Sequence, residues 1–181
     1  MRQTIPMSDF KASSPQTASV PAIARLRTGK LCVAIQAATP AELIERADAA
    51  LADTKFIELR LDSLGLASLS KPAATLAKVK DFLASHRDAT AIATCRRDSA
   101  GGQFAGSLKA ELDVLTEAAQ AGCQIVDLEV ESAEEAKPKQ FEEFRAGLRT
   151  AGAALLISFH DFSRTKGLEA AAQRIEAFRP D

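Results

Sequence analysis

The sequence predicts an α/β protein built from about five βα units. Short apolar runs, typical of buried strands, begin near Leu31, Phe56, Ala91, Gln124 and Ala154. They follow one another at intervals of roughly 25 to 35 residues, and the segments between them carry the apolar periodicity of amphipathic helices. Strands that alternate with helices at this spacing predict a parallel sheet.

The ends of the predicted helices have recognisable signals. Thr39 to Glu42 forms a capping box with proline at the first helical position, and Ser107 is a typical N-cap. The helix that follows Ser107 is expected to end at Gly122, and the next one at Gly152. A last helix is predicted for residues 167–178. These signals divide the chain into consecutive βα units.

Polar residues on the predicted strands distinguish between two sheet architectures. Glu58, Arg60 and Asp62 alternate along one strand and therefore lie on one face. The same one-sided pattern recurs on three later strands, with Thr94 and Arg96, Asp127 and Glu129, and Ser158 and His160. Strands of a doubly wound sheet are covered by helices on both faces and are expected to be apolar on both. Polar rows at strand ends are typical of the interior of a TIM barrel.

We therefore expect an incomplete TIM (β/α)8 barrel over residues 31–181, with a five-stranded doubly wound parallel sheet as the alternative. A complete barrel needs about 250 residues. Residues 179–181 follow the last predicted helix and are typical of a loop that leads into another strand. Residues 1–30 contain Pro6, Pro15 and Pro21 and show no periodicity, so they are predicted to be a disordered tail.

The composition narrows the classes of partner. Lys and Arg total 23 and Asp and Glu total 24, so charge gives no reason to expect nucleic acid or an anionic membrane as partner. No apolar run approaches the ~20 residues of a membrane span. Cys32, Cys95 and Cys123 lie in apolar runs without CxxC pairs, which predicts buried, reduced thiols in the cytoplasm and no zinc site.

Four motifs occur in order, each at the end of a predicted strand. They are Glu58 to Asp62 (ELRLD), Thr94 to Arg96 (TCR) followed by a glycine pair, Asp127 to Glu129 (DLE), and Ser158 to Phe162 (SFHDF). Together they resemble type I 3-dehydroquinate dehydratase, a Schiff-base lyase of the shikimate pathway, which leads to chorismate and the aromatic amino acids. The resemblance implies a TIM barrel without a cofactor that converts 3-dehydroquinate to 3-dehydroshikimate through a lysine imine.

The resemblance also implies roles for individual residues. His160 would be the general acid and base. The other candidates are the substrate-binding Glu58, Arg60 and Arg96, and the supporting Asp62, Asp127 and Glu129. These residue types suit the chemistry. An iminium makes the neighbouring C–H bond more acidic, and a histidine titrates in the range needed to take that proton. Arginines bind small acids that are rich in oxygen atoms. A divalent metal held by Asp127, Glu129 and His160 is the minor alternative.

Two departures from the family pattern set further expectations. Ala100 stands where the family has a glutamate that binds the catalytic histidine, so Asp98 or an acid on another strand is expected to replace it. The family's imine-forming lysine lies on a sixth strand, so this segment alone is expected to be inactive. The alternative is a non-catalytic or regulatory protein that retains the fold. Two questions are left undecided by the sequence. One is whether the chain is fused to shikimate dehydrogenase, as in some lineages, and the other is whether it forms a homo-oligomer through the open edges of its sheet.

Overall fold

The computed structural model describes residues 29–65, 69, 72–162 and 167–181. The predicted disordered tail of residues 1–30 therefore lies outside the described residues, apart from Gly29 and Lys30, which are exposed. Within the described part, strands and helices alternate as expected from the sequence.

The core of the fold is a parallel sheet wound in one direction. Its strands are β1 (Val33–Ile35), β2 (Phe56–Arg60), β3 (Thr90–Thr94), β4 (Ile125–Glu129) and β5 (Ala154–Ser158). They lie in the order β1-β2-β3-β4-β5, and every strand pairs in parallel with the next. A doubly wound sheet reverses its strand order part-way, so that alternative is wrong. The barrel-type winding is confirmed.

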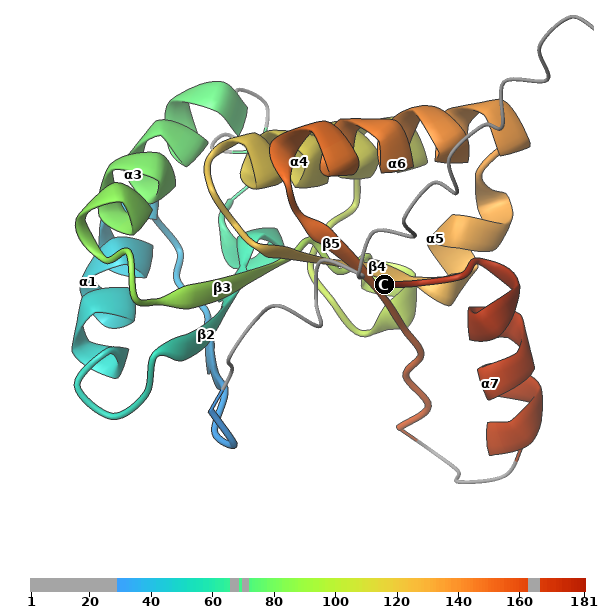
Figure 1. Cartoon of the computed structure of the whole chain (residues 1–181), viewed down its shortest axis with the longest axis horizontal. Helices are drawn as coiled ribbons and strands as arrows, with labels where there is room; N and C mark the ends of the chain where they lie inside the picture. The colour runs from blue at the N-terminus through green and yellow to red at the C-terminus, as the bar shows by residue number, and fades with distance from the viewer. Residues whose placement is uncertain (1–28, 66–68, 70–71, 163–166) are drawn as a thin grey trace, which may run out of the picture.

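The helices form a continuous outer layer. They are α1 (Pro40–Ala50), α3 (Pro72–Ser85), α4 (Leu108–Gln120), α5 (Val130–Glu135), α6 (Pro138–Ala151) and α7 (Leu168–Ala177), with short 3-10 helices η2 (Leu61–Ser63) and η3 (Asp98–Ala100). Helix α1 contacts α3, α3 contacts α4, and α4 contacts α6. In Figure 1 these four helices lie on the same side of the curved sheet, which leaves its other face open.

The predicted helix ends are confirmed where the structure describes them. Thr39 Oγ1 accepts a hydrogen bond from the Glu42 N–H at 3.2 Å, and Ser107 Oγ caps α4 in the same way. Gly152 ends α6 in the left-handed conformation with φ +76°. The acidic run at residues 131–135 forms the separate short helix α5, which precedes α6.

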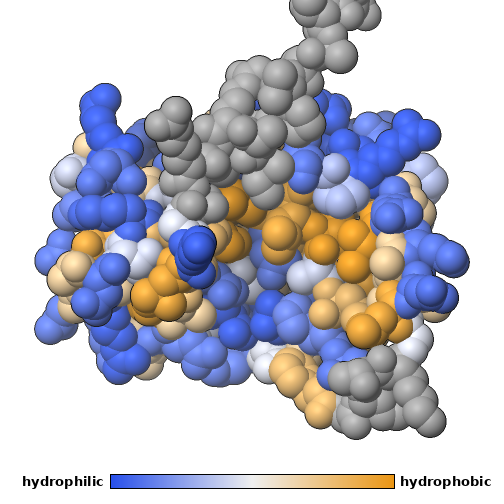
Figure 2. All heavy atoms as spheres, turned by 60° about the horizontal axis from the view of Figure 1, so that its bottom comes forward, coloured by the Kyte–Doolittle hydropathy of each residue, from blue (hydrophilic) through white to orange (hydrophobic). Residues whose placement is uncertain are grey.

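Alternation along the strands separates a closed face from an open one. Ile57 and Leu59 are fully buried between the sheet and the helices, as are Ala91 and Ala93 on β3. The residues between them are less buried, for example Ile92. Figure 2 views the molecule from the side of the open face, where apolar surface in the middle of the molecule is mixed with and bordered by hydrophilic side chains. The face that carries the polar rows is thus the face without helices.

Two of the three predicted buried cysteines are buried. Cys95 and Cys123 are almost completely inaccessible, and burial raises the pKa of the Cys123 thiol to about 12. Cys32 is exposed, so its predicted burial is wrong. It precedes the edge strand β1, which has a strand neighbour on one side only in the described chain. Apolar sequence neighbours predict a strand there, but they do not show that it lies at an edge.

After α7 the chain returns to the free edge of β5. The Asp181 N–H donates to the Leu155 carbonyl at 3.1 Å, and Asp181 Oδ2 accepts from the Leu155 N–H at 2.9 Å. Arg145 on α6 donates to the carbonyls of Phe178 and Arg179 and so fixes the end of α7. Across the described residues, no helix combines the length and apolar character that crossing a bilayer requires.

Candidate active site

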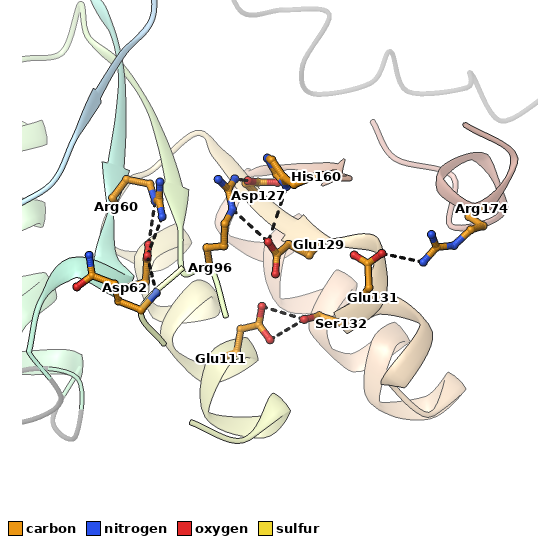
Figure 3. Close-up of polar contacts among 11 residues, drawn as sticks. Arg60, Asp62, Arg96, Glu111, Asp127, Glu129, Glu131, Ser132, His160 and Arg174 are labelled. Atoms are coloured by element: carbon orange, nitrogen blue, oxygen red, sulfur yellow. Dashed lines mark hydrogen bonds and ion pairs between the residues drawn. The ribbon is translucent and has the colours of Figure 1, made fainter. Parts of the chain in front are cut away.

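Polar side chains from β2, β3, β4 and β5 come together at the carboxyl ends of the strands (Figure 3). Arg60 is the last residue of β2 and Glu129 the last of β4, while Arg96 and His160 follow the ends of β3 and β5. In a parallel sheet these ends lie at one edge, which is why residues far apart in sequence meet here.

Arg96 lies at the centre of the group, between two carboxylates. Its Nη2 is 3.2 Å from Asp127 Oδ2, and its Nε is 3.1 Å from Glu129 Oε1. All three side chains are nearly buried, with exposed fractions of 11%, 5% and 3% for Arg96, Asp127 and Glu129. A single guanidinium therefore balances two carboxylates in a poorly hydrated setting.

His160 lies near the same oxygen of Glu129 as Arg96 does. Its Nδ1 is 3.8 Å from Glu129 Oε1, and its ring stacks on Phe162 with the ring centroids 6.0 Å apart. His160 Nδ1 and Glu129 Oε1 are both buried and have no hydrogen-bond partner among the described residues. The imidazole as a whole stays partly accessible from the open face.

Burial sets the protonation of this group. It is the largest cause that lowers the pKa of His160, and the charges of Arg96 and Arg60 lower it further. Burial also raises the pKa of Glu129 to about 7, against the attraction of Arg96. The pKa of Asp127 is raised by burial too, with Ser158 and Arg96 acting in the opposite direction. At neutral pH His160 is therefore mainly uncharged and able to accept a proton.

Arg60 and Asp62 form a separate pair joined by two parallel hydrogen bonds. Arg60 Nε donates to Asp62 Oδ1 at 2.9 Å, and Arg60 Nη2 donates to Oδ2 at 2.8 Å. Asp62 Oδ2 also accepts from the Gln103 N–H at 3.2 Å, which ties β2 to the loop after β3. Glu58 is half-buried on the same face, and its charge partly offsets the lowering of the pKa of His160.

The paired glycines allow the loop after β3 to pack against the site. Gly101 has φ +79°, and a Cβ there would lie 2.8 Å from the ring of Phe162. A Cβ on Gly102 would lie only 2.1 Å from the Arg96 carbonyl oxygen. Both positions therefore need glycine, because the backbone of the loop lies directly on Arg96.

Asp98 does not take over the role of the glutamate that the family has at the position of Ala100. It is exposed, and its Oδ1 accepts from the N–H of the adjacent Ser99 at 2.7 Å. The acid that approaches His160 is Glu129 on β4, which the sequence identified only as a supporting residue.

One further buried acid was not expected from the sequence. Glu111 on α4 is 1% exposed, and the Ser132 hydroxyl lies 3.1 and 2.9 Å from its two carboxylate oxygens. Burial raises the pKa of Glu111 to about 7. Its burial could have been predicted from its place on the apolar stripe of α4, between Leu108 and Leu115.

The geometry does not favour the metal alternative. The guanidinium of Arg96 already lies between Asp127 and Glu129, so a cation occupies the position that a metal would take. In the part of the chain that the structure describes, no three His, Cys, Asp or Glu side chains are grouped so that they could hold a metal ion.

Comparison with known proteins identifies the family. Residues 31–180 match the family model described as type I 3-dehydroquinase. The chain belongs to this family. A 3-dehydroquinate dehydratase from Desulfotalea psychrophila is 31% identical over 143 residues, which cover 79% of this chain and 56% of that protein. The chain thus spans little more than half the length of this relative of the type I dehydroquinase family.

Solved structures support the fold. The 3-dehydroquinate dehydratase from Enterococcus faecalis superposes with a TM-score of 0.69 at 22% identity, over 89% of this chain and 68% of that one. The enzyme from Geobacillus kaustophilus gives a TM-score of 0.68 at 17% identity, over 83% of this chain and 58% of that one. At these identities the likeness establishes a shared α/β fold of the barrel type.

Proposed function

We propose that this chain provides the catalytic histidine and substrate-binding arginines of a 3-dehydroquinate dehydratase. The observation that carries the proposal is a half-buried imidazole at His160 at the open ends of the strands, whose pKa is lowered by burial and by the charges of Arg96 and Arg60. Family membership and the names of the relatives support the same reaction. The substrate is a small molecule, and the enzyme is expected to act in the cytoplasm.

In this proposal His160 takes a proton from the carbon next to the substrate's imine and later delivers a proton to the leaving hydroxyl group. The C–H bond breaks and its electron pair moves into the cationic imine, giving an enamine; the pair then returns as the C–O bond breaks and water leaves, which gives the iminium of the product. Water hydrolyses this iminium, breaks the C–N bond to the lysine and releases 3-dehydroshikimate. Arg60 and Arg96 face the same space and would bind oxygens of the substrate. Glu58 would accept hydrogen bonds from its hydroxyl groups.

The imine requires a lysine, and we propose that this lysine lies outside the five βα units. The lysines in the described part of the chain lie on the outer helices or before a strand or helix begins, as Lys55 does before β2, and all are exposed. Lys11, Lys71 and Lys166 lie outside the described residues. A lysine that forms an imine here has to reach the carboxyl ends of the strands.

Borohydride reduction in the presence of 3-dehydroquinate tests the proposal. We expect the mass of the 181-residue chain to stay unchanged, and we expect trapping and turnover when the remaining βα units of the Desulfotalea psychrophila relative are joined after residue 181. In that assembled protein His160→Ala is expected to reduce kcat by about 10²- to 10⁴-fold while the imine is still trapped.

His86→Ala is the matched control, because His86 lies on the outer face between α1 and α3, where it pairs with Asp48. Its turnover is expected to equal that of the parent. An adduct on the 181-residue chain would mean that the lysine lies within it. Normal turnover of His160→Ala would remove His160 from the mechanism, and a complete absence of turnover and trapping in the assembled protein would favour the non-catalytic alternative.

A further inference from the structure

We propose that Glu129 is the positioning residue of His160. Its carboxylate holds the imidazole in the tautomer that is protonated at Nδ1, which leaves the lone pair of Nε2 free to act as the base. The catalytic meaning of this assignment rests on the function proposed above. The contact and the tautomer can be tested without any reaction.

Two buried atoms without partners face each other across this contact. Glu129 Oε1 and His160 Nδ1 are 3.8 Å apart, and neither has a hydrogen-bond partner within the described residues. Leaving a buried polar atom unbonded is costly, so a small rotation of either side chain that closes the gap is favourable. Catalytic hydrogen bonds are often long in structures without substrate and shorten when it binds.

The carboxylate is held in place by groups other than the imidazole. Arg96 Nε lies 3.1 Å from Glu129 Oε1, and the backbone of Arg97 also hydrogen-bonds the carboxylate. Both contacts come from the segment after β3 and favour the charged form of Glu129. Glu129 is therefore a fixed acceptor, whereas the imidazole after β5 is the group that has to be oriented.

Other acids near His160 have other partners. Asp127 faces Arg96 Nη2, and Glu131 pairs with Arg174 at 2.9 Å. The charges of Glu131, Glu58, Arg60 and Arg96 act on the pKa of His160 through space. Glu129 differs from these groups because its Oε1 lies 3.8 Å from His160 Nδ1. This contact supplies what the glutamate absent at Ala100 would otherwise provide, from a different strand.

A carboxylate that accepts from Nδ1–H determines which ring nitrogen carries the proton. It also makes Nε2 more basic, since the positive charge that develops on the ring is stabilised by the carboxylate. Because burial and two arginines lower the pKa of His160, this support keeps the imidazole effective as a base.

The test is an NMR measurement on the 181-residue chain labelled with ¹⁵N-histidine. The chain has two histidines, so long-range ¹H–¹⁵N correlations give the tautomer of each ring directly. At pH 8, above the pKa of about 7 of Glu129, we expect His160 to carry its proton on Nδ1. In Glu129→Gln the Nδ1–H population is expected to fall towards that of free imidazole, and the pKa of His160 is expected to fall with it.

Two controls distinguish the direct contact between Glu129 and His160 from the general effect of removing a negative charge nearby. Glu131→Gln removes the same charge two residues away and is expected to leave the tautomer of His160 unchanged. His86, whose Nδ1 lies 2.9 Å from the Phe82 carbonyl, is expected to give the same signals in all variants. The proposal is overturned if wild-type His160 carries its proton on Nε2, a result that needs no variant to fold, or if both glutamine variants shift it equally.

Kinetics then distinguish this proposal from the proposed function. In the assembled enzyme Glu129→Gln is expected to lower kcat with KM nearly unchanged and to move the acid limb of the pH profile with the pKa of His160. If the assembled enzyme has no activity but the tautomer is as expected, the proposed function fails and the contact stands. If His160→Ala abolishes turnover but wild-type His160 carries its proton on Nε2, only the assignment of Glu129 as the positioning residue fails.

Discussion

The two arginines of the site lie on neighbouring strands but differ in how completely they are bonded. Arg60 makes two parallel hydrogen bonds to the one carboxylate of Asp62, which also accepts a backbone N–H. Arg96 is shared between the carboxylates of Asp127 and Glu129, and several buried polar atoms around it have no hydrogen bond within the described residues.

The difference separates a rigid brace from a group that can exchange partners. The bidentate pair with Asp62 fixes β2 relative to the loop after β3 and holds the Arg60 guanidinium in one orientation, in which it can meet a ligand without rearranging. A buried cluster with one cation, two carboxylates and a neutral imidazole gains hydrogen bonds when a polar ligand arrives. The cluster around Arg96, in which buried polar atoms have no hydrogen bond within the described residues, lies next to His160, the residue proposed to act in catalysis.

The largest expected effect is on stability when the shared arginine is removed. Arg96→Met leaves two buried carboxylates without a cation, and we expect it to lower the free energy of unfolding by about 3–5 kcal/mol at pH 8. The loss should be smaller at pH 5, because burial raises the pKa of both Asp127 and Glu129 and both become protonated more readily.

Urea denaturation at the two pH values measures this effect, with Arg60→Met as the matched comparison. That variant leaves a single carboxylate, Asp62, which keeps the Gln103 N–H, so its loss should be smaller. Equal losses for the two variants at pH 8 would show that sharing one cation between two carboxylates has no energetic consequence here.

Neutralising one carboxylate at each site gives an effect of intermediate size. Asp62→Asn removes a charge-assisted bidentate pair and is expected to cost about 2 kcal/mol at pH 7. Glu129→Gln is expected to cost less than about 1 kcal/mol at the same pH, because burial already raises the pKa of Glu129 to about 7 and its neutral form is well populated. Thermal or urea unfolding of both variants checks the order, and the reverse order would contradict the comparison.

The last expected effect concerns the buried Glu111 behind the site. Its pKa is raised from 4.5 to about 7, so the folded protein holds a proton that the unfolded chain releases, and stability falls as the pH rises from about 4.5 through 7. Glu111→Gln removes this titration and is expected to stabilise the protein by about 1–2 kcal/mol at pH 8 relative to the parent.

Glu117→Gln, on the same helix and less buried, is the control and should leave the pH dependence unchanged. Denaturation midpoints between pH 5 and pH 8 give the comparison. A difference in stability between the parent and Glu111→Gln that stays constant over this range would show that Glu111 is ionised in the folded state.

Much of the fold could be predicted because its signals are local. Strand alternation assigned Glu58 and Arg60 to one face, and capping residues such as Thr39 gave the helix starts. The contact of Glu129 with His160 could not be predicted, because it depends on how β4 and β5 are aligned and on the rotamers of both side chains. The Glu111–Ser132 contact joins two helices and has no sequence spacing that reports it.

The linear order of the strands has a consequence for how the protein is made. Every strand hydrogen-bonds to the strand synthesised just before it, so no part of the sheet has to wait for a distant segment. Contacts that span about one βα unit close short loops, which favours stepwise growth while the chain leaves the ribosome. Arg60, Arg96 and Glu129 therefore reach their places in that order, and His160 arrives last, next to a carboxylate that its neighbours already hold.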